Sequence, residues 1–301
     1  MKNIRLFFRI FKPIPLVTCL LMYSLGVGIN DYQKESVDIQ AYLLGQSWVI
    51  LIQLSMTFLS KFFSHRKGKN LEYPNAVDTG NLLINNDHEG NKVYWWGGLT
   101  SFSGAAVISV LLITNRLMSV PVILLLLLTV ISVILFTTPP FTVERSGYGE
   151  FILSFWVVFL IPAVAYSLQK GGNFGLLFFI LVPSFFLHFA MQLALELKTY
   201  KVFPIKQAEN FLEHYGWRIG IYTHNASILV CFLVVGIGFI WGFPKFTFYI
   251  GLSLLPLGIF QILQMRRIQN GAKPLWNMIE LGAYSLFFLN AYLLSYAFWV
   301  Q

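Results

Sequence analysis

The stretch that decides the fold is Val120–Thr137, which reads VPVILLLLLTVISVILFT and contains no charged residue. Its length falls within the roughly 17 to 25 residues that a helix needs to cross the hydrocarbon core of a bilayer. Hydrocarbon cannot hydrogen-bond to backbone groups, so only helices and closed barrels span it. The stretch lacks the alternation of polar and apolar residues that is typical of a barrel strand, and it therefore predicts a transmembrane helix.

Similar apolar stretches recur along the whole chain. Hydrophobic residues make up 56% of the 301 residues and charged residues only 11%, a composition too apolar for a single water-facing surface. We predict an all-α fold, a polytopic membrane bundle of about nine transmembrane helices that forms a single domain over residues 1–301. The predicted spans are 14–29, 40–60, 96–114, 120–137, 150–168, 174–195, 219–241, 246–265 and 277–299.

The distribution of basic residues predicts how the bundle is oriented. Of the 21 Lys and Arg residues, all but Lys34, Arg116, Lys170 and Lys245 fall in the N-terminal segment or in every second loop. Because cytoplasmic loops carry the excess of positive charge, we expect a cytoplasmic N-terminus and an external C-terminus. The predicted cytoplasmic loops are about 61–95, 138–149, 196–218 and 266–276. The net charge of +8 then indicates membrane lipids with anionic headgroups as partners and requires no nucleic acid.

Polar residues inside predicted spans are the first functional candidates, because burying them in a membrane is costly. His188, Gln192 and Glu196 recur every four residues and so share one helix face. They either line a polar cavity that binds substrate or hydrogen-bond to neighbouring helices. The pattern fixes no nucleophile and no acid/base pair. Five further residues are expected to face the same space: Gln53, His224, Asn225, Glu280 and Tyr284.

A cationic segment follows the sixth predicted span. Lysine binds phosphate as a mobile point charge, and arginine binds it through a fixed fork of donors. We therefore expect an anion-binding site made of Arg145, Lys198, Lys201 and Lys206. The alternative is that these residues only set the membrane topology.

Three runs of sequence resemble a known family. Thr138–Glu150, which reads TPPFTVERSGYGE, is similar to the run before the fifth helix in menaquinone-type members of the UbiA superfamily of intramembrane prenyltransferases. Phe8–Pro13 resembles the start of that family, and Tyr166–Gly171 resembles the end of its fifth helix. The resemblance implies a UbiA-like helical bundle with a cytoplasmic-side cavity. It also implies an isoprenoid or quinone-like lipid, or an isoprenoid diphosphate, as the ligand.

Active members of this family carry two aspartate-rich motifs that hold Mg²⁺ against the diphosphate leaving group. At the position of the first motif this chain has Ser60, Lys61 and Ser64, and at the second Glu196 is the only carboxylate nearby. Both motifs are therefore degenerate. We expect no metal site, with Mg²⁺ as a cofactor only if the protein is active.

Two other acidic segments are candidate replacements for these motifs. Asn30–Asp38 fits the first motif at three of its four fixed positions, but it follows the first span and lies on the predicted outer side, so we interpret it as a solvated loop. Asp78, Asp87 and Glu89, with His88, lie on the predicted cytoplasmic side, but their spacing does not match the motif.

These patterns leave three functional hypotheses. The first is a divergent UbiA-type protein that binds an isoprenoid lipid or diphosphate and has lost or altered the Mg²⁺-dependent catalysis, with a role as a subunit of a membrane complex left open. The second is an active prenyltransferase with atypical phosphate-binding residues. The third is a small-solute transporter, although no matching pair of interrupted spans is visible.

Overall fold

The computed structural model describes residues 13–33, 36–68, 87–172, 174–202 and 211–301. Within these ranges the chain is helical and has no strand. Nine helices of the described chain are long and apolar enough to cross a membrane. The prediction of an all-α, polytopic membrane bundle is confirmed.

The chain divides into two compact units by internal contacts. Unit 1 consists of Met1–Leu20 and Ile39–Thr142, and unit 2 consists of Leu21–Asp38 and Val143–Gln301. Helix α2, Pro13–Tyr32, contributes residues to both units. The expectation of a single domain stays a prediction.

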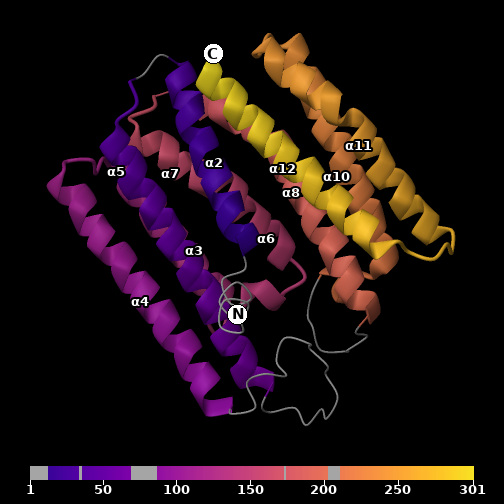
Figure 1. Ribbon diagram of the computed structural model, residues 1–301, viewed down its shortest axis with the longest axis horizontal. Helices are drawn as coiled ribbons and strands as arrows, with labels where there is room; N and C mark the ends of the chain where they lie inside the picture. Colours follow the sequence, from indigo (N-terminus) through magenta and orange to yellow (C-terminus); the bar gives the residue numbers. More distant parts are fainter. Residues whose placement is uncertain (1–12, 34–35, 69–86, 173, 203–210) are drawn as a thin grey trace, which may run out of the picture. The chain divides into compact units, whose positions relative to one another are not determined.

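Unit 1 is built on a long pair of helices. Helices α3, Ile39–Gly68, and α4, Asp87–Thr114, lie side by side, and α5, Val120–Thr137, packs against α3 (Figure 1). The indole Nε1 of Trp48 donates a hydrogen bond of 2.9 Å to Ser109 Oγ and so ties α3 to α4. Helix α5 has the bounds that the sequence predicted.

In unit 2, the fifth span is one continuous rod with a local distortion. Helix α6, Gly149–Phe155, runs into a π-helical turn, η2, Trp156–Leu160, and then into α7, Ile161–Leu168. Pro162 accounts for the wider turn, because its ring cannot donate a backbone hydrogen bond and would clash with the preceding turn of a regular helix. The turn keeps the span helical on both sides of the proline.

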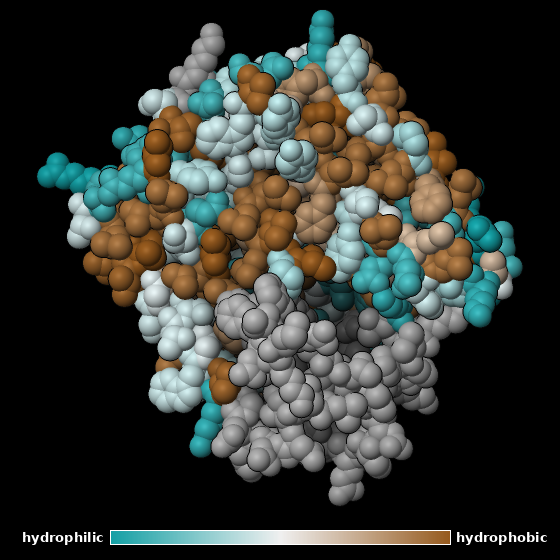
Figure 2. Space-filling view, viewed as in Figure 1, coloured by the Kyte–Doolittle hydropathy of each residue, from teal (hydrophilic) through white to brown (hydrophobic). Residues whose placement is uncertain are grey.

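Four long helices of unit 2 contact one another in a closed cycle. Helix α8, Phe174–Val202, packs against α10, Trp217–Ile240, and against α12, Trp276–Val300. Helix α11, Lys245–Gln269, contacts both α10 and α12 (Figure 1). Hydrophobic side chains cover much of the visible face over α11 and α12, and hydrophilic ones gather where α11 ends (Figure 2). This distribution suits helices whose outer faces meet lipid.

Helices α2 and α7 approach closely. An ideal Cβ on Gly26 would lie 2.5 Å from the carbonyl oxygen of Pro162, so only glycine allows this packing. Farther along, Tyr166 Oη donates a 2.6 Å hydrogen bond to Gln33 Oε1. Asn30 lies between these two contacts on α2 and is 0% exposed. The interpretation of Asn30–Asp38 as a solvated loop is therefore wrong for Asn30, which is helical and buried.

Several helices extend beyond the predicted spans. Helix α3 continues to Gly68 and α4 begins at Asp87, so the predicted loop 61–95 is helical at both ends. Helix α8 continues to Val202, and a short helix α9, Phe211–Tyr215, lies within the predicted loop 196–218. Helix α11 likewise enters the predicted loop 266–276. Hydropathy marks where apolar side chains stop, and a polar helix can continue past that point.

Candidate functional site

A chain of hydrogen bonds joins α6 to α8 through His188. The Ser154 hydroxyl donates to the Glu150 backbone carbonyl at 2.7 Å, and Ser154 Oγ lies 2.8 Å from His188 Nδ1. Gln192 Nε2 lies 3.4 Å from His188 Nε2. Because the hydroxyl proton of Ser154 is already used, Nδ1 must donate and Nε2 must accept. Both ring nitrogens of His188 are therefore engaged, Nδ1 with Ser154 of α6 and Nε2 with Gln192 of the same helix.

We expect ¹⁵N NMR of histidine-labelled protein to find the His188 proton on Nδ1, because this tautomer satisfies every member of the chain. Ser154→Ala removes the acceptor and is expected to move the proton toward Nε2. The His188→Gln spectrum assigns the signal. A proton on Nε2 in the wild-type protein would contradict this hydrogen-bond chain.

Glu196, which the resemblance aligns with the second aspartate-rich motif, is bonded to the short helix α9. Its Oε1 accepts the backbone N–H of Leu212 at 3.0 Å. The neighbouring carboxyl group of Glu150 accepts the backbone N–H of Phe211 and lies within hydrogen-bonding reach of Glu196. Two adjacent amides at the start of α9 therefore meet two carboxyl groups, one from α6 and one from α8. Glu196 is buried at this contact.

Two glycines in the run Thr138–Glu150 explain its sequence. An ideal Cβ on Gly149 would lie 2.7 Å from the carbonyl oxygen of Glu144, and one on Gly147 would lie 3.0 Å from the His214 side chain in α9. The chain can thus turn tightly into α6 and bring Glu150 under α9. The run also contains a cis peptide bond between Pro139 and Pro140 and a 3-10 turn, η1, Val143–Arg145.

Tyrosine contacts complete the docking of α9. The rings of Tyr148 and Tyr215 lie 6.2 Å apart, edge to face. A side-chain hydrogen bond with Tyr148 raises the pKa of Tyr215 above its ordinary value. Phe211 meets Phe189 of α8 at 6.1 Å. Helix α9 is therefore attached through carboxyl groups on one part and through aromatic rings on another.

Lys198 forms an ion pair with α12. Its Nζ lies 2.5 Å from Glu280 Oε2, and the two side chains are 40% and 32% exposed. The sequence predicts that Lys198 binds phosphate and that Glu280 faces the same space as His188, Gln192 and Glu196. The structure brings these two residues into contact.

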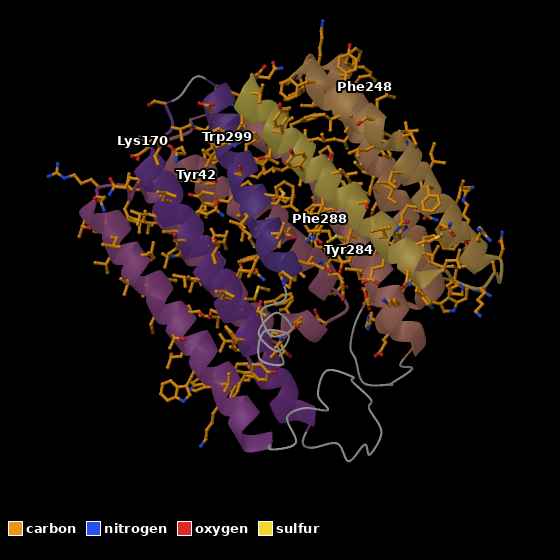
Figure 3. The ribbon with its side chains drawn as sticks, viewed as in Figure 1. Tyr42, Lys170, Phe248, Tyr284, Phe288 and Trp299 are labelled. Atoms are coloured by element: carbon orange, nitrogen blue, oxygen red, sulfur yellow. The ribbon has the colours of Figure 1, made fainter. Side chains whose placement is uncertain are left out.

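Two further contacts hold α8 against α12, and both are buried. Asn290 Nδ2 donates a hydrogen bond of 2.9 Å to Ser184 Oγ. The rings of His188 and Phe287 lie 4.8 Å apart. On the same helix Tyr284 and Phe288 are one turn apart, with ring centroids 6.2 Å from each other (Figure 3). Both are half-buried, so part of each ring is left uncovered by the protein.

The first motif position lies in unit 1, where α3 meets α4. The ammonium group of Lys61 lies over the ring of Tyr94, 5.7 Å from its centroid. In the part of the chain that the structure describes, no group of three or more His, Cys, Asp or Glu side chains could hold a metal ion. The ammonium group of Lys61 repels Mg²⁺, so Lys61 itself does not fit this metal as a ligand.

The remaining candidates are placed as follows. Arg145 ends η1 and Lys201 lies in the last turn of α8, but their side chains are not described. Lys206 lies outside the described residues. Gln53 is in unit 1, where its Oε1 accepts a hydrogen bond of 3.6 Å from the Cys19 thiol. The His224 Nδ1 lies 3.0 Å from Asn225 Oδ1 on α10.

Three residues of this site were not predicted from the sequence. Ser154 is a serine in an apolar span, with no feature that separates it from others. Glu150 was noted only as the last residue of the resembling run, and Asn290 lies among apolar residues of the last span. The run Gly-Tyr-Gly-Glu was the one available signal for Glu150.

Solved structures match almost the whole chain. A structure of digeranylgeranylglyceryl phosphate synthase is 10% identical, and the match covers 100% of both chains with a TM-score of 0.64. A UbiA homolog from Archaeoglobus fulgidus bound to GPP and Mg²⁺ is 13% identical, covers 98% of this chain and 100% of its own, and has a TM-score of 0.67. The same homolog bound to DMAPP and Mg²⁺ is 12% identical, covers 97% and 98%, and has a TM-score of 0.64.

No family model matches the chain, and no curated protein matches it by sequence. The nine apolar helices define an integral, multi-pass membrane protein. The fold is that of the solved digeranylgeranylglyceryl phosphate synthase and UbiA homolog. The fold implied by the resemblance at Thr138–Glu150 is therefore confirmed.

Proposed function

We propose that this protein binds an isoprenoid diphosphate within the membrane and that its Mg²⁺-dependent catalysis is lost or altered. The diphosphate group would lie near Lys198, at the end of α8, with Arg145, Lys201 and Lys206 as further cationic contacts. The isoprenoid chain would extend along the apolar interior of the helices. In this proposal the diphosphate end faces the cytoplasm.

The fold supports the ligand class. UbiA homologs of the same fold have been solved with GPP or DMAPP and Mg²⁺. The stripe of Tyr284 and Phe288 offers half-buried aromatic surface next to the ion pair of Lys198. Aromatic and apolar side chains with a few polar groups at one end are typical of sites for such amphipathic ligands.

The observation that carries the proposal is how few oxygen ligands Glu196 can offer. Its Oε1 accepts the backbone N–H of Leu212 at 3.0 Å, so only Oε2 is left for a metal, and a single carboxylate oxygen is not a Mg²⁺ site. Lys61 lies at the other motif position and packs on Tyr94. Neither position therefore offers a set of oxygen ligands, and the proposed protein holds its ligand mainly through cations and apolar contacts.

A second candidate is an active prenyltransferase with atypical phosphate-binding residues. The Mg²⁺ complexes of the structural neighbours favour it, since they pair this fold with diphosphate and metal. In that case Glu196 would bind the metal through Oε2, while Oε1 keeps its hydrogen bond from Leu212. The transporter hypothesis loses its support at His188, because both ring nitrogens are engaged with Ser154 and Gln192.

The test is ligand binding and turnover with the purified full-length protein in nanodiscs. We expect geranyl diphosphate to bind, and Lys198→Met to weaken its binding about tenfold, since a hydrogen bond to a charged group contributes roughly 1.5–3 kcal/mol. Lys245→Met serves as a control at a lysine outside the proposed site. Arg145→Ala is expected to weaken binding in the same direction as Lys198→Met.

Turnover separates the two candidates. We expect no Mg²⁺-dependent release of diphosphate from geranyl diphosphate, with or without an added aromatic acceptor. Release that depends on Mg²⁺ and disappears in Glu196→Gln would establish the active enzyme instead. Absence of any binding of geranyl diphosphate would overturn both candidates.

A further inference from the structure

The ion pair between Lys198 and Glu280 engages the lysine that the proposed function assigns to phosphate. Among the described residues it is the one salt bridge found, although the same end of unit 2 carries Arg218, Arg266, Arg267 and Lys273. Arg218 lies over the ring of Trp217, 5.5 Å from its centroid. Glu280 therefore pairs with Lys198, although several other cationic side chains belong to the same region.

The pair is not needed to join its two helices. Helices α8 and α12 are already held by the buried contacts Asn290–Ser184 and His188–Phe287. Lys198 and Glu280 are each about a third exposed or more, and ion pairs of this kind add little stability because water and salt screen them. A role in ligand binding accounts better for a carboxylate at this place.

Glu280 also begins the aromatic stripe of α12. Glu280, Tyr284 and Phe288 are spaced four residues apart and so lie on one helix face, over about 12 Å of helix length. The half-buried rings of Tyr284 and Phe288 lead from the ion pair toward the middle of the span (Figure 3). A ligand with its tail on these rings would bring its headgroup to the Nζ of Lys198, where the Glu280 carboxylate now lies.

We propose that Glu280 is a specificity-determining residue of this site, whose carboxylate competes with the phosphate groups of the ligand for Lys198. The inference rests on the proposed function, because it assumes that Lys198 binds phosphate. A bound anion must displace Glu280 from Lys198 and is also repelled by it. Both costs arise from charge, so neutral isoprenoids do not meet them.

Removing the competitor should therefore strengthen anion binding. We expect Glu280→Gln to bind inorganic pyrophosphate about fivefold to tenfold more tightly than the wild-type protein at low salt. The gain should be smaller for orthophosphate, because repulsion scales with ligand charge, and smaller for both at 1 M salt. The affinity for a neutral isoprenoid alcohol, geraniol, should not change.

The experiment is calorimetric titration of the full-length protein in nanodiscs with pyrophosphate, orthophosphate and geraniol. Glu213→Gln is the control, since it removes one negative charge from α9 without breaking the ion pair. In the double variant Lys198→Met with Glu280→Gln, the gain should disappear. Glu280→Ala provides a second variant if Glu280→Gln does not fold.

The outcomes are distinguishable. If Glu280→Gln leaves pyrophosphate affinity unchanged or weaker while Lys198→Met still reduces it, Glu280 is only a contact between helices and this inference is wrong, whereas the proposed function stands. If Glu213→Gln gives the same gain as Glu280→Gln, the effect is a general one of charge and the inference is also wrong. If Lys198→Met does not change pyrophosphate binding, the phosphate site itself is refuted.

Discussion

Replacing Gly26 by alanine is expected to destabilise the protein by about 1–3 kcal/mol, and replacing it by valine is expected to leave little folded protein. The added Cβ would lie 2.5 Å from the carbonyl oxygen and 2.8 Å from the Cα of Pro162. Both are backbone atoms, so no side chain can rotate away. Helices α2 and α7 would have to separate, and the hydrogen bond from Tyr166 to Gln33 would be strained with them.

Gly236 provides the matched control for this prediction. It also lies within a transmembrane helix, α10, but an ideal Cβ there would meet nothing within 4 Å. Gly236→Ala should leave the unfolding temperature unchanged or raise it slightly, because alanine favours the helix. Thermal unfolding in detergent, followed by size-exclusion chromatography, measures both variants. Equal stability of Gly26→Ala and Gly236→Ala would contradict the close packing of α2 on α7.

The sequence predicted the spans well because membrane insertion depends on a local property. The apolar run at Val120–Thr137 coincides with α5, and every other predicted span falls on a helix. The π-helical turn at Trp156–Leu160 was not predicted, although Pro162 was a visible signal for a distortion. The helical ends beyond the predicted spans were missed, because a hydropathy scale gives polar residues the same values in a helix as in a loop.

The candidate site was harder to predict because its contacts join distant parts of the chain. The spacing of His188, Gln192 and Glu196 predicts one helix face, and in the structure His188 contacts Gln192. The partners of that face are Ser154, Glu150 and the backbone of α9, which no pattern within α8 can reveal. The charges in the sequence do not predict that Lys198 of α8 pairs with Glu280 of α12.

Loss of the hydrogen bond between Glu196 and Leu212 is expected to have the second large effect, the detachment of α9. In Glu196→Ala the buried N–H of Leu212 loses its acceptor, which costs about 1–3 kcal/mol. Because α9 is only five residues long, it has little stability of its own. We expect α9 to detach locally, with the amides of Phe211 and Leu212 exchanging hydrogen roughly tenfold faster or more.

Glu196→Gln is the informative counterpart. Its amide oxygen can accept the N–H of Leu212, and its NH₂ group can donate to the Glu150 carboxyl, so α9 should stay docked with near wild-type exchange. Glu280→Ala is the control, since it removes a carboxylate that bonds Lys198 rather than α9. Hydrogen exchange read by mass spectrometry on peptides that contain α9 compares the three variants.

The pair of Glu196 variants also separates an anchoring role from a metal-binding role. An amide is a far weaker ligand for Mg²⁺ than a carboxylate, so a metal-binding Glu196 would lose function in both variants. If Glu196 instead anchors α9, pyrophosphate binding is lost only in Glu196→Ala, because only that variant frees α9. We expect pyrophosphate binding to persist in Glu196→Gln and to weaken in Glu196→Ala. Equal loss in both variants, with α9 still protected from exchange in Glu196→Gln, would contradict the anchoring role.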